Sequence, residues 1–95
     1  MKAYWITLCQ VTDDEGYGEY IKLAGPAIEK FGGKYLVRGG KFSVLEGKHN
    51  FERNVVIEFK SIKLAKECYN SKEYQEAKSY RNDKADFNAI VIEGY

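Results

Sequence analysis

The sequence predicts an α+β domain in which a four-stranded antiparallel sheet carries two helices on one face. Short runs rich in β-branched and aromatic residues alternate with longer segments whose apolar residues recur at helical spacing. These segments follow one another in the order β-α-β-β-α-β. The 95 residues suffice for one hydrophobic core and are too few for two, so residues 1–95 are read as a single domain.

The first strand is expected over residues 3–11, where Trp, Ile, Thr, Val and Tyr suit a pleated sheet. The first helix follows, because apolar residues from Tyr17 to Phe31 are spaced by 3, 1, 3, 4 and 3 positions and share one helical face. Acidic residues 13–15 lie at its start, where the helix dipole favours negative charge. Gly32-Gly33 lies at its end, where a left-handed cap is needed.

Pro26 lies within this expected helix and disfavours the helical conformation. Pro26 removes a backbone hydrogen bond and its ring meets the carbonyl of Lys22, at a cost of about 3 kcal/mol or more. Gly25 beside it makes a bend easier to adopt. A kink or break is therefore predicted at Pro26.

A bent second strand is expected in the middle of the chain. It begins over residues 34–38, is interrupted by Gly39-Gly40, and resumes an extended pattern over residues 41–45. The glycines match neither GxGxxG nor GxxxxGK[ST], so no phosphate loop is predicted. Residues 48–52 read as a polar loop with the only histidine, His49, which is expected to be solvated and not to bind metal.

The second half of the chain repeats the pattern of the first. Residues 55–59 form the third expected strand, and Ser61 is an N-cap for the second helix. Asn70-Ser71 restarts that helix, with Ser71 as a new cap. Residues 87–93 form the last strand. The resulting order is that of a ferredoxin-like domain, with both helices on one face of the sheet.

Strand parity predicts a partner for this sheet. Alternate residues point to opposite faces, and both faces of the first and last strands are apolar. Two helices can cover only one face, so a second copy packing sheet against sheet is expected to cover the other. The first strand presents Tyr4, Ile6 and Leu8 on one face and Trp5, Cys9 and Val11 on the other.

The composition and charge of the chain argue against nucleic acid and membranes as partners. The formal net charge is +1, which gives no basic footprint for nucleic acid or an anionic membrane. No apolar run reaches the roughly 20 residues that span a bilayer, and the amino terminus does not resemble a secretory signal. Cys9 and Cys68 fall in a predicted strand and helix without companion ligands, which indicates buried thiols in a reducing cytoplasm.

Several motifs together resemble a known family. These are GGKYLVRGG at 32–40, LEG at 45–47, RNVVIEF at 53–59, YNSKEYQEAKSYR at 69–81 and VIEGY at 91–95. In this order they resemble the domain-of-unknown-function family thirteen-thirty, of the dimeric α/β-barrel superfamily. The resemblance implies a ferredoxin-like subunit in a two-fold homodimer whose sheets face each other. It implies no reaction and no cofactor.

The chain departs from the family pattern at three places. Lys60 stands where many relatives have proline, and Cys68 stands where an aromatic residue is usual. Residues 48–50 differ from the usual segment after LEG. The resemblance therefore implies no ligand chemistry for that loop.

Arginine supplies the first candidate ligand-binding side chains. Arg38 ends an apolar strand just before a glycine pair, where it could hold a carboxylate or phenolate by two hydrogen bonds. The alternative is a structural ion pair with Glu46, Glu58 or a carboxylate of the partner chain. Arg53 and Arg81 occur in the resembled motifs and carry the same two interpretations.

Tyrosines and carboxylates complete the candidate set. Tyr20 and Tyr74 lie on inward helix faces and could donate hydroxyl groups to a ligand between helices and sheet, or could be core residues, as Trp5 could be. Glu46 and Glu58 could act as a general base if burial raised their pKa, or could form interface ion pairs.

Three functional hypotheses follow. The first is a homodimer that binds a small aromatic or carboxylate-bearing ligand through Tyr20, Arg38, Glu46, Arg53, Tyr74 and Arg81. The second is a cofactor-independent monooxygenase or isomerase, which rests on superfamily analogy. The third is a scaffold without a ligand.

Overall fold

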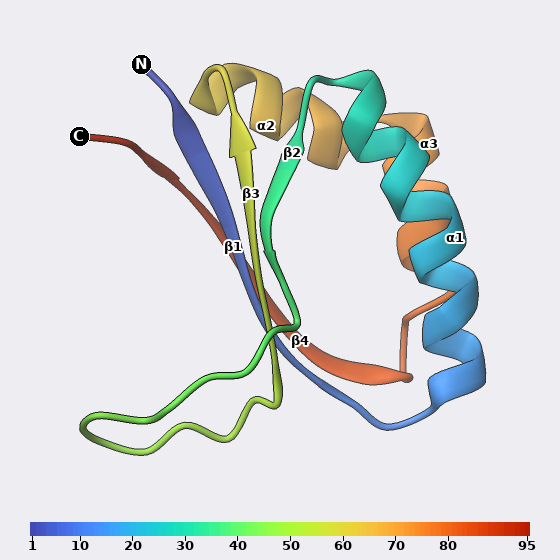
Figure 1. Cartoon of the computed structure of the whole chain (residues 1–95). Coiled ribbons are helices and arrows are strands. Elements are labelled where there is room, and N and C mark those ends of the chain that lie inside the picture. Colours follow the sequence, from blue (N-terminus) through green and yellow to red (C-terminus); the bar gives the residue numbers. More distant parts are fainter.

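The fold consists of a four-stranded antiparallel sheet with helices packed on one of its faces (Figure 1). The computed structural model describes residues 1–95. The strand order β2-β3-β1-β4 places the two long central pairings around β1 and confirms the predicted ferredoxin-like topology. The elements are β1 (Ala3–Val11), α1 (Asp14–Lys30), β2 (Lys34–Arg38), β3 (Arg53–Phe59), α2 (Ile62–Asn70), α3 (Lys72–Ser79) and β4 (Ala85–Glu93).

Helix α1 ends at the glycines that the sequence indicates, and it begins at an N-cap, Asp13, among the expected acidic residues. The Asp13 carboxylate accepts hydrogen bonds from the backbone N–H groups of the first turn. At the other end Gly32 takes a φ of +80°, which glycine adopts without strain. The expected break at Pro26 is wrong, because the helix continues to Lys30. Gly25 has no Cβ to clash with the proline ring, so it can keep the helical conformation that other residues before proline avoid.

The predicted continuation of the second strand is also wrong. Strand β2 ends at Arg38, and residues 39–52 form an arm without regular secondary structure. This arm projects away from the sheet, on the side opposite the helices (Figure 1). Gly39 has a φ of +71° and turns the chain out of the strand. Because the arm has no neighbouring strand, its extended residues form no ladder.

His49 is half-buried and not fully solvated as expected, because the arm folds around it. Its ring centroid lies 5.2 Å from that of Phe42 and 6.0 Å from that of Phe51. Its Nε2 lies 2.9 Å from the side-chain oxygen of Asn54, at the start of β3. These contacts hold the two limbs of the arm together.

Ser71 joins α2 to α3 and confirms the predicted restart. Its hydroxyl donates a hydrogen bond of 2.7 Å to the carbonyl of Cys68 at the end of α2. The same oxygen accepts a hydrogen bond of 3.1 Å from the N–H of Tyr74 in the first turn of α3. One side chain therefore ends one helix and begins the next.

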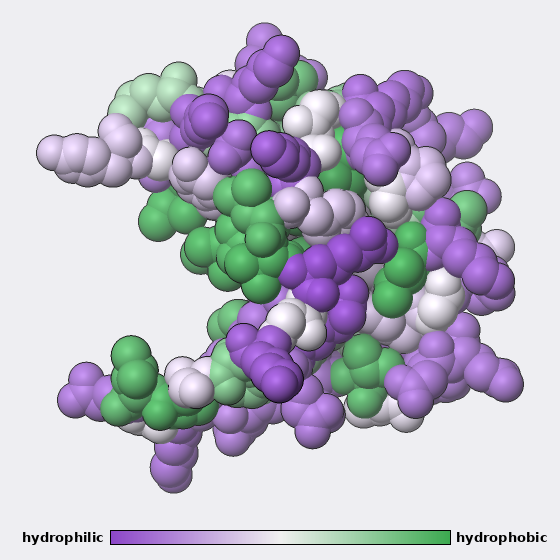
Figure 2. All heavy atoms as spheres, in the orientation of Figure 1, coloured by the Kyte–Doolittle hydropathy of each residue, from purple (hydrophilic) through white to green (hydrophobic).

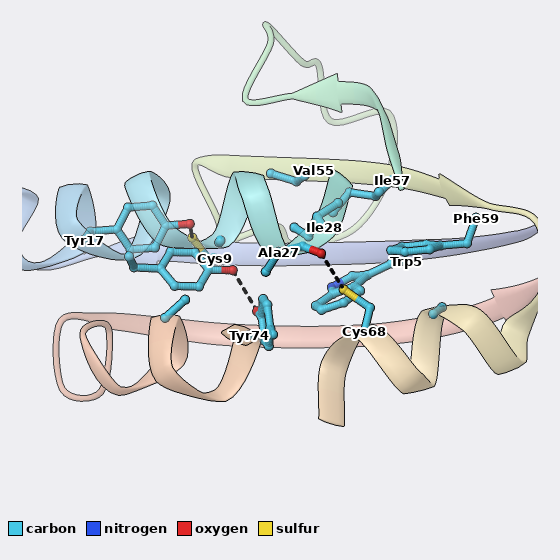
Figure 3. Close-up of a cluster of buried hydrophobic side chains, with 14 residues drawn as sticks. Trp5, Cys9, Tyr17, Ala27, Ile28, Val55, Ile57, Phe59, Cys68 and Tyr74 are labelled. Atoms are coloured by element: carbon cyan, nitrogen blue, oxygen red, sulfur yellow. Dashed lines mark hydrogen bonds between the residues drawn. The ribbon is translucent and has the colours of Figure 1, made fainter. Parts of the chain in front are cut away.

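The core fills the space between the helices and the sheet. Trp5, Phe59 and Tyr74 are buried there, and the free thiols of Cys9 and Cys68 are buried beside them as predicted (Figure 3). The two thiols contact neighbouring polar groups: Cys9 bonds the hydroxyl of Tyr17, and Cys68 bonds the carbonyl of Ala27.

No helix of the fold combines the length and the apolar composition that a membrane-spanning segment requires.

The opposite face of the sheet is apolar and carries no helix. In Figure 2 apolar side chains gather on this side, and the surface is hollowed between the sheet and the arm. The side chains of Ile90 and Ile92 are 59% and 51% exposed, and Leu45 on the arm is 97% exposed. We call this surface the open face. Its apolar residues on the sheet are Tyr4, Ile6, Leu8, Val37, Val56, Ile90 and Ile92.

Candidate functional site

A buried arginine and two tyrosines are linked between the helices and the sheet. The Nη2 of Arg81 lies 3.4 Å from the hydroxyl oxygen of Tyr74, to which it donates a hydrogen bond. The hydroxyl oxygens of Tyr74 and Tyr20 lie 2.7 Å apart. The hydroxyl oxygen of Tyr74 has two lone pairs, so it can accept from Arg81 and still bond Tyr20, with either hydroxyl as the donor. The structure thus brings together three of the residues that the sequence singles out.

Three different segments position these side chains. Tyr20 lies on the inner face of α1, and Tyr74 lies in the first turn of α3, which the Ser71 cap fixes. Arg81 follows α3, and its backbone N–H bonds the carbonyl of Lys78. Its guanidinium lies over the ring of Phe87 in β4, with 3.6 Å between its Cζ and the ring centroid.

Arg81 is only 7% exposed and has no carboxylate partner. The ion pairs of the protein are all made by lysines, so the guanidinium charge is balanced only by hydroxyl and aromatic groups. Its Nε is buried and has no hydrogen-bond acceptor in the protein. A buried charge without a carboxylate partner is costly, and perturbed ionisable groups cluster at functional sites.

Tyr20, Tyr74 and Arg81 all keep their protons at neutral pH, so each can donate a hydrogen bond. Burial raises the pKa of Tyr20 well above its ordinary value, and the neighbouring Tyr74 raises it further. Burial also raises the pKa of Tyr74, although the Arg81 charge opposes this. Burial alone would lower the pKa of Arg81, but the Tyr74 hydroxyl reverses the effect and the pKa is raised. At neutral pH both tyrosines are therefore neutral and the arginine is charged.

A cavity of about 450 Å³ lies beside Arg81, between β4 and the helices α2 and α3. Its volume falls within the range of small-molecule sites. Aromatic rings of Trp5, Tyr69 and Phe87 line it, together with the cationic side chains of Lys66 and Lys78. Its polar lining is completed by two amides, and no carboxylate lines it. The remaining lining residues are Ala65, Asn70, Asn88, Ala89, Ile90 and Val91.

Arg38 and Arg53 lie apart from this cavity. They line a narrow cavity of about 20 Å³ between α1 and the sheet, together with Tyr17 and Tyr20. That volume holds about one water-sized species. Trp5 and Phe87 line both cavities, so the aromatic core separates them. The predicted single site is therefore divided into two clusters of arginine and tyrosine.

The two candidate carboxylates lie elsewhere. Glu46 is exposed on the arm and lines neither cavity. Glu58 lies on the open face of the sheet, where its carboxylate is 3.3 Å from the Nζ of Lys2. Neither side chain faces the buried arginine within this chain, so a role for Glu46 in ligand binding stays a prediction.

Sequence reasoning missed the walls of the larger cavity. Lys66, Tyr69 and Lys78 belong to α2 and α3, and Phe87 belongs to β4. Lys66 and Tyr69 are three residues apart on one helix, a spacing that places them on one face and could have indicated a shared surface. The closeness of that face to β4 depends on the tertiary packing and has no local signal.

One protein-family model matches nearly the whole chain. The model of the family described as Domain of unknown function (DUF1330) matches residues 2–95. The chain belongs to the DUF1330 family. No curated protein matches this DUF1330 chain in sequence.

Solved structures resemble the DUF1330 chain in fold. A protein of unknown function from Rhodopseudomonas palustris has a TM-score of 0.80 at 21% identity, covering 99% of this chain and 82% of its own. SnoaB, a cofactor-independent oxygenase from Streptomyces nogalater, has a TM-score of 0.64 at 3% identity, covering 99% and 93%. A dimeric protein of unknown function with a ferredoxin-like fold from Bacteroides fragilis has a TM-score of 0.59 at 13% identity, covering 98% and 96%. At these identities the likeness shows the ferredoxin-like fold alone.

Proposed function

We propose that this DUF1330 protein binds a small aromatic ligand carrying a carboxylate or phenolate group, in the cavity beside Arg81. The observation that carries the proposal is the guanidinium itself, which is buried, unpaired with any carboxylate and placed at the wall of a cavity of about 450 Å³. An anionic group on the ligand would supply the missing charge and an acceptor for the Arg81 N–H groups.

The rest of the cavity suits the remainder of such a ligand. Trp5, Tyr69 and Phe87 offer ring faces and edges against which an aromatic ring can pack. Lys66 and Lys78 add positive charge at the same wall, and this favours an anion over a neutral or cationic molecule. Lys66 is exposed and Lys78 half-buried, so they lie nearer the solvent than Arg81 does.

The same geometry favours binding over proton abstraction. A general base must reach the substrate in its deprotonated form at working pH. No carboxylate lines the cavity, and the raised pKa values of Tyr20 and Tyr74 keep their hydroxyl groups protonated. The alternative of a cofactor-independent monooxygenase or isomerase rests on likeness of fold to proteins such as SnoaB.

A homodimer is part of the proposal. The open face carries apolar residues on all four strands, and the arm adds exposed Phe42, Val44 and Leu45 beside it (Figure 2). The hollow between sheet and arm fits the sheet of a second copy with its arm on the other side. The Bacteroides fragilis protein of the same fold is dimeric. We also expect a cytoplasmic location, because Cys9 and Cys68 are unpaired thiols.

Calorimetric titration with benzoate, salicylate and 4-nitrophenolate tests the ligand proposal. We expect saturable binding of at least one of these anions, and no binding of the neutral benzyl alcohol. Lys66→Gln and Lys78→Gln should each weaken binding severalfold, and Arg81→Gln should abolish it. Lys22→Gln, on the outer face of α1, is the matched control and should bind normally.

Circular dichroism establishes that each variant is folded before it is titrated. If the wild-type protein binds none of the three anions, or binds benzyl alcohol equally well, the proposal is wrong. Should Arg81→Gln fail to fold, the two lysine variants still decide, because their side chains are not in the core.

A further inference from the structure

The other two arginines of the chain also lack carboxylate partners. Arg38 and Arg53 appear in none of the ion pairs, which join lysines to Asp13, Glu19, Glu58 and Glu73. The Nε of Arg53 is buried and has no acceptor in the protein. Two cations near each other with no counter-charge repel, so their proximity needs an explanation.

The pairing of β2 with β3 brings the two side chains together. Arg38 lies opposite Val55, and Arg53 is two residues before Val55 on the same strand. Arg38 and Arg53 are therefore diagonal neighbours on the helix-facing side of the sheet, a relationship that separates the backbones by about 7–8 Å. Long side chains at that separation can reach a common anion.

Aromatic rings and a glycine fix the two guanidinium groups. The Cζ of Arg38 lies 4.3 Å from the ring centroid of Tyr35, and the Cζ of Arg53 lies 5.7 Å from that of Tyr17. A Cβ at Gly39 would lie 2.7 Å from the Nη1 of Arg53. The Arg53 guanidinium therefore packs directly against the backbone at the end of β2.

We propose that Arg38 and Arg53 form an anion-binding site for a carboxylate or phosphate group, separate from the Arg81 cavity. The narrow cavity beneath them holds about 20 Å³, so no more than one oxygen atom of the anion enters it and the rest of the ligand lies outside, at the exposed Arg38. The polar groups that surround this place are the two guanidiniums and hydroxyl groups, chiefly those of Tyr17 and Tyr35, and no acidic side chain lines it. An oxyanion accepts hydrogen bonds and donates none, which matches this lining.

The proposal does not depend on the Arg81 cavity. Either site can be occupied, or fail to be occupied, without the other, because the arginines belong to different segments and the aromatic core lies between the cavities. Substitutions at Arg38 should leave benzoate binding beside Arg81 unchanged.

Nuclear magnetic resonance titration of the dimeric full chain with inorganic phosphate and with acetate tests this site. Ionic strength is held constant with sodium chloride. We expect saturable shifts in the amide resonances of Gly39 and Asn54 with phosphate, with acetate or with both, and the effective anion identifies the chemistry of the natural group. Affinity should fall at least tenfold in Arg38→Gln and in Arg53→Gln.

Lys41→Gln is the matched control, because Lys41 is a neighbouring cation that does not line the narrow cavity. Its affinity for the anion should equal that of the wild type. The proposal is overturned if neither anion gives saturable shifts. That result is expected if a carboxylate of a second subunit already neutralises Arg38 and Arg53. The proposal is equally overturned if Lys41→Gln weakens binding as much as Arg38→Gln. Arg38 is exposed, so Arg38→Gln decides even if Arg53→Gln does not fold.

Discussion

The hydroxyl oxygens of Tyr20 and Tyr74 lie 2.7 Å apart, although 54 positions separate the two residues in the sequence. This contact joins α1 to α3 above the sheet, and Arg81 extends it to β4 through its stacking on Phe87. Tyr74 is the central member, because it accepts from Arg81 and also contacts Tyr20.

The two tyrosines should differ in their contribution to stability. Tyr74→Phe removes the only side-chain acceptor of the buried Arg81 charge and should cost about 1.5–3 kcal/mol, whereas Tyr20→Phe removes one neutral hydrogen bond and should cost about 0.5–1.5 kcal/mol. Urea denaturation of both variants and of the double variant measures these costs and their coupling. Equal costs for the two single variants would contradict the role of Tyr74 as the acceptor for the buried Arg81 charge.

Alkaline pH should destabilise the protein. Burial raises the pKa of Tyr20 and of Tyr74 above the ordinary 10.0, and burial raises the pKa of the Cys68 thiol from 9.0 to about 12. Above pH 9 the unfolded chain therefore loses protons that the folded chain retains, and the free energy of unfolding falls as pH rises. Below pH 9 the protein retains the full free energy of unfolding that these protonated groups contribute.

Denaturant unfolding between pH 7 and pH 11 measures this loss. Cys68→Ala should flatten the curve between pH 9 and pH 10, where the thiol of the unfolded chain titrates before the tyrosines do. A wild-type stability that stays constant up to pH 11 would show that these groups are not buried in solution.

Gly33 should not tolerate a side chain. A Cβ there would lie 2.4 Å from Cγ2 of Ile28 and 2.9 Å from Cζ of Phe59, so Gly33→Ala should destabilise the protein by about 1–3 kcal/mol through overpacking. Gly18→Ala is the matched control, since no atom lies within 4 Å of its Cβ and alanine favours a helix by up to about 1 kcal/mol. Thermal unfolding of both variants should give opposite shifts in Tm.

The Ser71 cap should matter more than other serines on these helices. Ser71→Ala removes the hydroxyl that bonds both Cys68 and Tyr74, and should cost about 1–2 kcal/mol. Ser79→Ala, in which an exposed hydroxyl bonds back to the carbonyl of Glu76, should change stability by less than about 0.5 kcal/mol. Chemical denaturation distinguishes the two, and a neutral Ser71→Ala would refute the shared cap.

Charged residues introduced on the open face should prevent the homodimer from forming. Ile90→Lys with Ile92→Lys places two unpaired charges in the proposed sheet-to-sheet contact, so light scattering should show a monomer. Leu23→Lys adds a charge on the exposed side of α1 and should leave the dimer intact. A wild-type protein that is monomeric at micromolar concentration would remove the homodimer from the proposal.

Local patterns predicted most of the fold. The caps at Ser61 and Ser71 and the first strand were predicted correctly because each depends on neighbours in sequence. The arm was not, since residues 41–45 have strand-like composition and only the missing neighbouring strand keeps them irregular.

The sequence indicated that Tyr20 and Tyr74 face inward, but it did not indicate how the candidate residues are arranged. Arginine and tyrosine on inward faces indicated Tyr20, Tyr74 and Arg81, which the structure links. The division into two clusters depends on how α1 and α3 pack over the sheet. That packing also decides the distance from Arg38 to Arg81, and no sequence spacing encodes it.

The shared cap at Ser71 has a mechanical consequence for the Arg81 cavity. Its two helical walls, with Lys66 and Tyr69 on α2 and Lys78 on α3, meet at this single extended residue, whose ψ is 153°. The Ser71 hydroxyl bonds Cys68 on one wall and Tyr74 on the other, so it sets the angle between the walls independently of the ladder of β1 with β3 and β4. The width of the cavity mouth thus depends on one side chain that belongs to neither helix and to no strand.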